Sequence, residues 1–231
     1  MTEAIWLTSA DPAPLLDHVA VHGSARKLRL CAVACARRSF ALLSSHDSRE
    51  AIEAAERHAD GEGGAAALAA VEQAAARAAM EEGFFLMPAA AAAACAAVAS
   101  PAEALRTVFQ AYRQKAIRDA VYHCALPREE VEAVATATAE EHDLQCELLY
   151  EVFGNPYRPV TLEPHVSRWN NSCVVKLARV IYDERRWHEL PILGDALADA
   201  GCVNETLLAH FYQVGEHVRG CWALDVVLGR S

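Results

Sequence analysis

The sequence predicts an all-α protein, a multi-helix bundle in which a long alanine-rich helical hairpin is inserted between N- and C-terminal helical blocks. Helix-forming residues dominate and alanine is far above its usual share, whereas Gly (11) and Pro (9) are sparse among 231 residues. Helix start and stop signals recur along the whole chain. With 53% hydrophobic residues, the chain can bury a core without disulfides or other staples.

The N-terminal block, residues 1–60, is predicted to contain three capped helices. Each begins at a Ser or Asp that can accept a hydrogen bond from a backbone N–H of the first turn. The third also carries Glu50 three residues after its cap, which completes a capping box. The predicted caps and ends are Asp11 and Gly23, Ser24 and about Leu43, and Asp47 and Gly61.

The alanine-rich arm, residues 64–152, follows the flexible stretch "GEGG". Dense alanine lets helices approach closely, which favours a long antiparallel hairpin or bundle. Ser100 followed by Pro101 and Glu103 is a clear helix start. The predicted helices cover residues 65–81, 89–99, 100–124 and 127–153.

A connector rich in proline, residues 153–170, separates the arm from a compact C-terminal block, residues 171–231. Four short helices are predicted in that block, and we expect the N- and C-terminal blocks to pack as one domain. Asn204 is expected to cap the third helix. The fourth is "EHVRGCWALDVVLG", whose apolar residues would form one broad face if residues 216–228 were helical throughout.

Charge argues against nucleic acid and membranes as partners. The net charge is −10 and the pI about 5.4, so the surface repels phosphates and anionic lipids on average. The strongest basic stretch, "SARKLRLCAVACARR", is read as a solvated helix with ion pairs, and nucleic-acid association is kept as a third hypothesis. No signal peptide or spanning helix is predicted, so we expect a soluble cytoplasmic protein whose cysteines are reduced.

Several stretches resemble a family of bacterial helical proteins that is abundant in planctomycetes and has no assigned function. They include "RKLRLCAVACARR", "EVFGNPYRPVTLEP", "VVKLARVIYDERRWHELPILGDALADAGC" and "HVRGCWALDVVLG". The resemblance implies a helical domain split by an alanine-rich insert of variable length, and it implies no activity. Family members often read "AHCR" where this chain has "AHFY" at 209–212. The cysteine beside His210 is therefore missing, which argues against a metal role at that point.

Cys and His pairs at i, i+4 spacing are the candidate metal ligands, since this spacing places two side chains on one helix face. His217 and Cys221 form one pair, and Asp225 would extend it by a further turn. Zinc would accept such ligands with a fourth donor from another helix, although burial as ordinary core residues is the alternative. The other candidate pairs are His18 and His22, Cys31 and Cys35, and His142 and Cys146.

Catalytic signatures are missing from the sequence. There is no HExxH, GxSxG, P-loop or GxGxxG, and Glu-x-x-His does not occur twice. His142 and Cys146 could formally make a nucleophilic pair, but side chains on one helix point outward side by side and no oxyanion hole is evident. We therefore expect a non-enzymatic protein, and no catalytic residue is assigned.

Two further stretches are candidate contact surfaces. "GFFLMP" carries Phe84, Phe85, Leu86 and Met87 at a helix break, where they either pack into the core or form an exposed apolar tip that binds a partner. Arginine pairs could bind an anion or bridge domains, and these are Arg185 with Arg186 and Arg37 with Arg38. The leading hypothesis is a protein-interaction module, such as an adaptor, a regulatory subunit or a self-associating scaffold. A metal-binding helical protein or metalloenzyme is the alternative.

Overall fold

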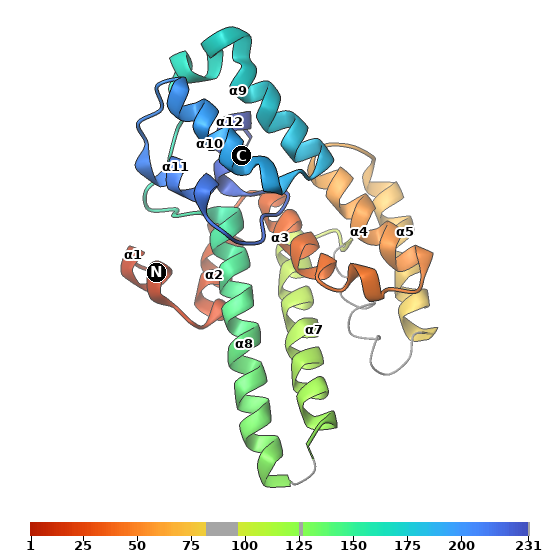
Figure 1. The fold of residues 1–231 in the computed structure, drawn as a ribbon. Helices are drawn as coiled ribbons and strands as arrows, with labels where there is room; N and C mark the ends of the chain where they lie inside the picture. The colour runs from red at the N-terminus through yellow and green to blue at the C-terminus, as the bar shows by residue number, and fades with distance from the viewer. Residues whose placement is uncertain (82–96, 125–126, 231) are drawn as a thin grey trace. The chain divides into compact units, whose positions relative to one another are not determined.

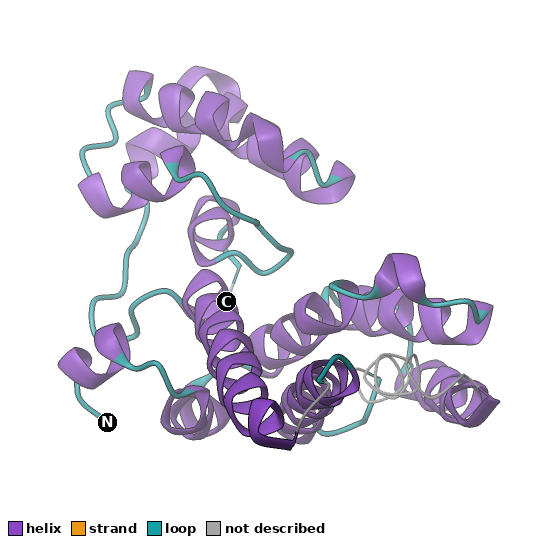
Figure 2. Cartoon of the chain, turned by 60° about the horizontal axis from the view of Figure 1, so that its bottom comes forward, coloured by secondary structure: helices purple, strands orange, loops and turns teal. Residues whose placement is uncertain are grey.

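The computed structural model describes residues 1–81, 97–124 and 127–230. Every regular element in these ranges is a helix (Figure 2), which confirms the predicted all-α class. The chain divides into two compact units, Met1–Leu149 and Tyr150–Ser231. The predicted packing of both terminal blocks into one domain stays a prediction. None of the described helices combines the length and the apolar character that crossing a membrane requires.

The first unit contains seven α-helices and one short 3-10 helix among the described residues. The last of them, α8, extends beyond the unit, so that its end from Tyr150 onward belongs to the second unit. The elements are α1 (Glu3–Thr8), α2 (Pro12–His22), α3 (Ala25–Arg37), η1 (Phe40–Leu42), α4 (His46–Ala59), α5 (Ala65–Glu81), α7 (Pro101–Tyr122) and α8 (Pro127–Phe153).

Helix starts in the first unit largely follow the predicted caps. The side chains of Asp11, Ser24 and Ser100 accept hydrogen bonds from first-turn N–H groups of α2, α3 and α7. The predicted cap at Asp47 is wrong, because Ser45 caps α4 and leaves Asp47 inside the first turn. A carboxylate is favourable at both places, at the cap as an acceptor and in the first turn through the helix dipole, so the local pattern does not separate them.

Helix α3 ends earlier than the predicted Leu43. After Arg37 the backbone tightens, since the N–H of Arg38 bonds to the Cys35 carbonyl and that of Ser39 bonds to the Ala36 carbonyl. The short helix η1 then follows. Such 3-10 turns commonly finish an α-helix by satisfying its last carbonyls.

Helix α3 forms the centre of the first unit, packed against α4 and α7, while α5 packs against α4 (Figure 1). Its small residues Cys31, Ala32, Cys35 and Ala36 are fully buried and let the neighbouring helices approach closely. A polar cluster continues this core. It joins Arg38, Tyr112, Glu141 and Gln145.

In that cluster the Arg38 guanidinium donates to both Glu141 oxygens at 2.7 and 2.8 Å. The Gln145 amide donates to Glu141 and to the Phe109 carbonyl. The Tyr112 hydroxyl donates to the Ala36 carbonyl at 3.0 Å. Glu141 is therefore buried with its hydrogen-bonding capacity used, as a buried charge requires.

The second unit follows the end of α8 and contains α9 (Pro164–Glu184), η2 (Trp187–Glu189), α10 (Leu190–Asp199), α11 (Glu205–Tyr212) and α12 (Trp222–Leu228). Helix α10 packs against α9 and α11, and α12 packs against α9. Leu193, Ile181, Phe211 and Leu224 lie fully buried in the core that these helices share. The predicted cap Asn204 accepts a hydrogen bond from the Leu207 N–H.

Three predicted features of the arm and the C-terminal half differ from the structure or are not confirmed by it. The connector is non-helical only over residues 154–163, because α9 begins at Pro164 and contains a non-helical break at Trp169–Ser172. The last predicted helix is wrong in its first half, since residues 213–221 are not helical and α12 begins at Trp222. The insertion of an alanine-rich hairpin is not confirmed, and the helix predicted at 89–99 lies largely outside the described residues.

Candidate metal centre

Four side chains of the second unit converge on one point. Glu151 comes from the end of α8, His210 from the last turn of α11, His217 from the segment 213–221, and Cys221 from the position that precedes α12. One donor atom from each lies within 4.8 Å of the donor atoms of the other three. Across residues 1–81, 97–124 and 127–230, this is the one place where three or more such donors meet.

Individual contacts within the group are short. His210 Nε2 lies 3.1 Å from Cys221 Sγ and 3.4 Å from Glu151 Oε2. His217 Nδ1 lies 3.0 Å from Glu151 Oε1, which accepts its hydrogen bond. The two imidazole rings are 5.1 Å apart between centroids and meet edge to face.

The segment 213–221 brings His217 and Cys221 together through a turn. Helix α11 ends where the Gln213 N–H bonds to the His210 carbonyl. A second turn is closed by the Cys221 N–H on the Val218 carbonyl at 3.1 Å, with Gly220 at φ 89°. Glycine adopts this left-handed conformation at low cost, whereas a side chain there would be strained. The turn leads directly into α12.

The group is almost closed to solvent. Cys221 is fully buried, and the side chains of His210, His217 and Glu151 are only 8%, 7% and 12% exposed. The ring of Trp222 lies 5.0 Å from that of His210, measured between centroids, and meets it edge to face. Charges that form here are therefore poorly screened by water.

Burial and mutual contact shift the pKa values in the group. Burial, and then the charge of Glu151, raises the pKa of the Cys221 thiol well above its usual range. Burial also lowers the pKa of His210, more than the attraction of Glu151 raises it. For His217 burial acts to lower the pKa, but the hydrogen bond and the charge of Glu151 outweigh it and raise the pKa. Without a cation the thiol is therefore neutral.

A nucleophilic triad does not fit this geometry. In a Cys-His-Glu triad the thiol and the carboxylate contact opposite ring nitrogens, so that the carboxylate orients the imidazole. Here Cys221 and Glu151 both approach Nε2 of His210. A fully buried thiol with a raised pKa is also a poor nucleophile.

A tetrahedral metal ion does fit the four donors. Zinc binds His nitrogen, Cys sulfur and carboxylate oxygen at about 2.0–2.3 Å, which places neighbouring ligand atoms about 3.3–3.7 Å apart. Three of the six donor separations, at 3.0, 3.1 and 3.4 Å, lie at or slightly below that spacing, and all six are within 4.8 Å. The backbone of Gln213 also hydrogen-bonds to the His217 ring, the kind of outer contact that orients metal-bound histidines.

Of the three donors predicted along one helix, the structure brings two together and not the third. His217 and Cys221 meet, but Asp225 is not among the converging donors. The helical spacing from His217 to Asp225 does not exist, because helix α12 starts only at Trp222. Sequence reasoning missed Glu151 and discounted His210, and no local pattern links either of them to residues 217–221.

The other predicted pairs remain isolated. Cys31 and Cys35 are buried side by side on α3, where burial raises both pKa values, that of Cys35 to about 12. His142 and Cys146 lie one turn apart on α8. Neither of these pairs, nor the pair His18 and His22, belongs to a group of three converging donors among the described residues.

The structure describes the arginines predicted to bind an anion but not the apolar residues predicted to bind a partner. Arg37 pairs with Glu56 at 2.7 Å and Arg38 pairs with Glu141, so internal carboxylates already occupy both guanidinium groups. Arg186 pairs with Glu184 and Glu189, and Arg185 ends α9 with a positive φ. The apolar candidates Phe84, Phe85, Leu86 and Met87 lie outside the described residues.

Comparison with known proteins returned no matching family model, curated protein or solved structure. The resemblance to the planctomycete-type family therefore stays a prediction.

Proposed function

We propose that the second unit is a zinc-binding helical module in which Glu151, His210, His217 and Cys221 hold one Zn²⁺. The observation that carries the proposal is the convergence of four nearly buried donors within 4.8 Å. The donors come from three separate parts of the unit, the end of α8, helix α11 and the segment 213–221, so the arrangement is a product of the tertiary fold.

The donor chemistry favours zinc. Calcium and magnesium prefer six or more oxygen ligands, which two imidazoles and a thiol do not supply. Cupric ions prefer a tetragonal arrangement, whereas a closed set of four mixed N, S and O donors suits tetrahedral zinc. The carboxylate of Glu151 and the thiolate form of Cys221 would together neutralise the dication.

The proposed role of the ion is structural. Catalytic zinc sites keep one position open for water or substrate, while structural sites use four protein ligands. Here four protein donors are available and their side chains are nearly buried. The ion would tie the segment 213–221 to the end of α8 and to α11, and would thereby order the non-helical entry to α12.

Metal content and cobalt spectroscopy test the proposal. The 231-residue chain is purified with Zn²⁺ in the medium, dialysed and analysed for metals, and we expect one zinc per chain. Replacement by Co²⁺ is expected to give a sulfur-to-cobalt charge-transfer band and the strong visible bands of a tetrahedral site. Glu151→Gln is expected to weaken zinc binding by at least about tenfold, since one ligand is lost.

A matched pair of cysteine variants provides the control. Cys221→Ser is expected to lose the charge-transfer band, while Cys202→Ser, also buried in the second unit, is expected to keep it. If the wild-type protein takes up no stoichiometric zinc, or if both cysteine variants retain the same cobalt spectrum, the proposed site is wrong.

The protein-interaction role predicted from the sequence stays a prediction, and the apolar stretch proposed to display its binding tip, residues 83–88, lies outside the described residues. The third hypothesis, nucleic-acid association, depended on the basic residues of α3. Three of these are engaged internally: Arg26 pairs with Asp60, Arg37 pairs with Glu56, and Arg29 donates to the carbonyls of Val98 and Ala99. We therefore place the zinc-binding function first.

A further inference from the structure

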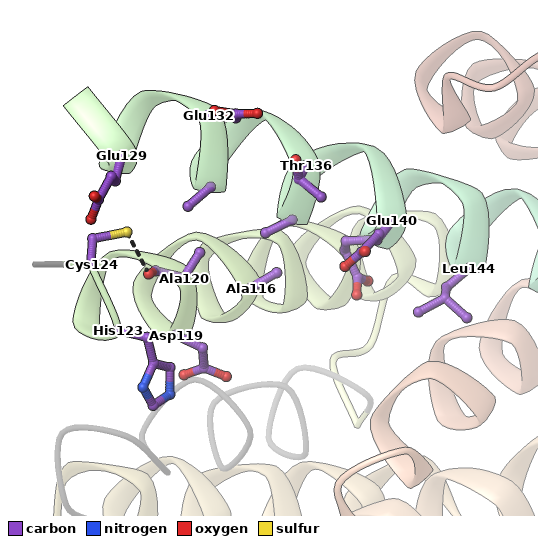
Figure 3. Close-up of a pocket in the computed structure, with 13 residues that line it drawn as sticks. Ala116, Asp119, Ala120, His123, Cys124, Glu129, Glu132, Thr136, Glu140 and Leu144 are labelled. Atoms are coloured by element: carbon purple, nitrogen blue, oxygen red, sulfur yellow. Dashed lines mark hydrogen bonds between the residues drawn. The ribbon is translucent and has the colours of Figure 1, made fainter. Parts of the chain in front are cut away.

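Helices α7 and α8 of the first unit run side by side (Figure 1), and residues of both line a groove between them (Figure 3). The groove has a volume of about 730 Å³ and is lined by residues of both helices. Its floor is formed by small apolar side chains, and Leu144 lies at one end. The alanines are Ala116 and Ala120 on α7, and Ala133 and Ala137 on α8.

The charged residues along the groove are acidic. Its lining includes five carboxylates and neither lysine nor arginine. Two of the carboxylates have partners, since Asp119 pairs with Lys115 and Glu141 pairs with Arg38. The other three are exposed, and they are Glu129, Glu132 and Glu140.

The three exposed carboxylates follow one face of α8. Their spacings of three and eight residues, with Thr136 between, return to the same side of a helix. The groove side of α8 runs from Glu129 to Leu144, which at 1.5 Å per residue is about 24 Å. A helix of four to five turns would match this length, and the alanine floor would allow its backbone to approach closely.

We propose that this groove binds an amphipathic helix of a partner protein, with one small apolar face and Lys or Arg along its flanks. The apolar face would cover the alanines, while the basic side chains would meet Glu129, Glu132 and Glu140. Binding of this kind reuses helix-in-groove recognition, in which residues at i, i+3, i+4 and i+7 anchor the ligand. Every lining residue belongs to Met1–Leu149, so the proposal does not depend on zinc.

Charge also decides against other occupants. Nucleic acid would place phosphates against the carboxylates. A second copy of this chain would bring a further net charge of −10 to an acidic surface. A basic helix is the occupant whose charge complements the groove.

Peptide binding to the 231-residue chain tests the proposal. The probe is a fluorescein-labelled amphipathic peptide of about 18 residues, with alanine and leucine on one face and lysine on its flanks. Its counterpart carries glutamate in place of lysine. We expect the basic peptide to raise the fluorescence anisotropy with saturable binding that weakens as salt is added, and the acidic peptide to leave it unchanged.

Two triple variants separate the groove from the overall charge. Glu129→Gln with Glu132→Gln and Glu140→Gln removes the exposed groove carboxylates, and about tenfold weaker binding is expected from three surface ion pairs. The matched control removes three charges of α8 outside the groove lining through Glu130→Gln, Asp143→Asn and Glu147→Gln. That control is expected to bind as the wild type does.

A steric variant, Ala137→Phe, fills the floor and is expected to abolish binding while circular dichroism shows unchanged helicity. Equal binding of the basic and acidic peptides would overturn the proposal. Equal loss in the groove and control triple variants would do the same, because it would show only attraction to the net charge. Dimerisation that is lost in the groove triple variant, without peptide binding by the wild type, would assign the groove to a second copy instead.

Discussion

Removal of zinc is expected to loosen the second unit locally, and hydrogen exchange can measure by how much. The four proposed ligands come from the end of α8, from α11 and from the segment 213–221, which leads directly into α12. Any opening that separates α11 from α12 therefore breaks the coordination. The opened state has no assembled site, so zinc binds only the closed state.

The magnitude follows from this linkage. A ligand that binds only the closed state stabilises it by RT ln(1 + [L]/Kd), which is about 2.7 kcal/mol when free zinc is about 100 times Kd. This free energy corresponds to about 100-fold slower exchange of amides that exchange through that opening. We expect this slowing for the backbone amides of α11 and α12 when chelated protein is compared with zinc-loaded protein by mass spectrometry.

Controls define what would refute the reasoning. Amides of α3 in the first unit are expected to exchange at the same rate with and without zinc. The effect should vanish in His210→Gln and persist in Cys202→Ser. Zinc that leaves α11 and α12 unchanged, or that slows exchange equally in His210→Gln, would show that the ion does not bridge these elements.

Two further predictions concern packing and thiol chemistry. Gly154 has φ 61° and an added Cβ would lie 2.8 Å from the Trp222 ring, so Gly154→Ala should lower the free energy of unfolding by about 2–4 kcal/mol, measured by urea denaturation. Gly229→Ala, at φ 65° with open space around the Cβ, should cost only the backbone part, about 1–2 kcal/mol, and an equal loss in both would contradict the clash. Cys35 is fully buried with a pKa of about 12, so at pH 8 it should hold about a thousandfold less thiolate than a thiol of ordinary pKa 9.0. Iodoacetamide followed by peptide mapping should label the half-buried Cys124 well before Cys35, which should react only as the pH approaches 12 or the protein unfolds, whereas early labelling of Cys35 would contradict its burial.

Local hydrogen bonds explain why the helices were largely predictable. A cap such as Ser24 or Asn204 accepts from an N–H three residues away, so the sequence contains both partners of the interaction. The same reasoning selected Asp47 instead of Ser45, since two neighbouring residue types can serve as caps. The all-α class follows from many such signals together, and one misplaced cap does not change it.

The segment before α12 was mispredicted for a different reason. The apolar residues of 216–228 recur at a spacing that suits a helix, and Gly220 is the one local signal against a helix that begins before Trp222. In the structure Gly220 adopts a positive φ and His217 is held by Glu151, which lies 66 residues earlier in the chain. Tertiary contacts of this kind override helix propensity, and a window of a few residues does not contain them.

The candidate metal centre shows how a spacing rule can select two of the right residues for the wrong reason. The i, i+4 rule pointed to His217 and Cys221 because it assumed a helix, and the same assumption added Asp225. In the structure a turn closed at Cys221 brings His217 and Cys221 together instead. Such a turn does not place Asp225 next to them. The remaining donors must then come from other elements, and Glu151 and His210 are the ones that the tertiary fold supplies. The proposed ligands are far apart in the sequence, and only the tertiary fold of the second unit brings them together. The zinc-binding and hydrogen-exchange experiments therefore test this fold as directly as they test the proposed function.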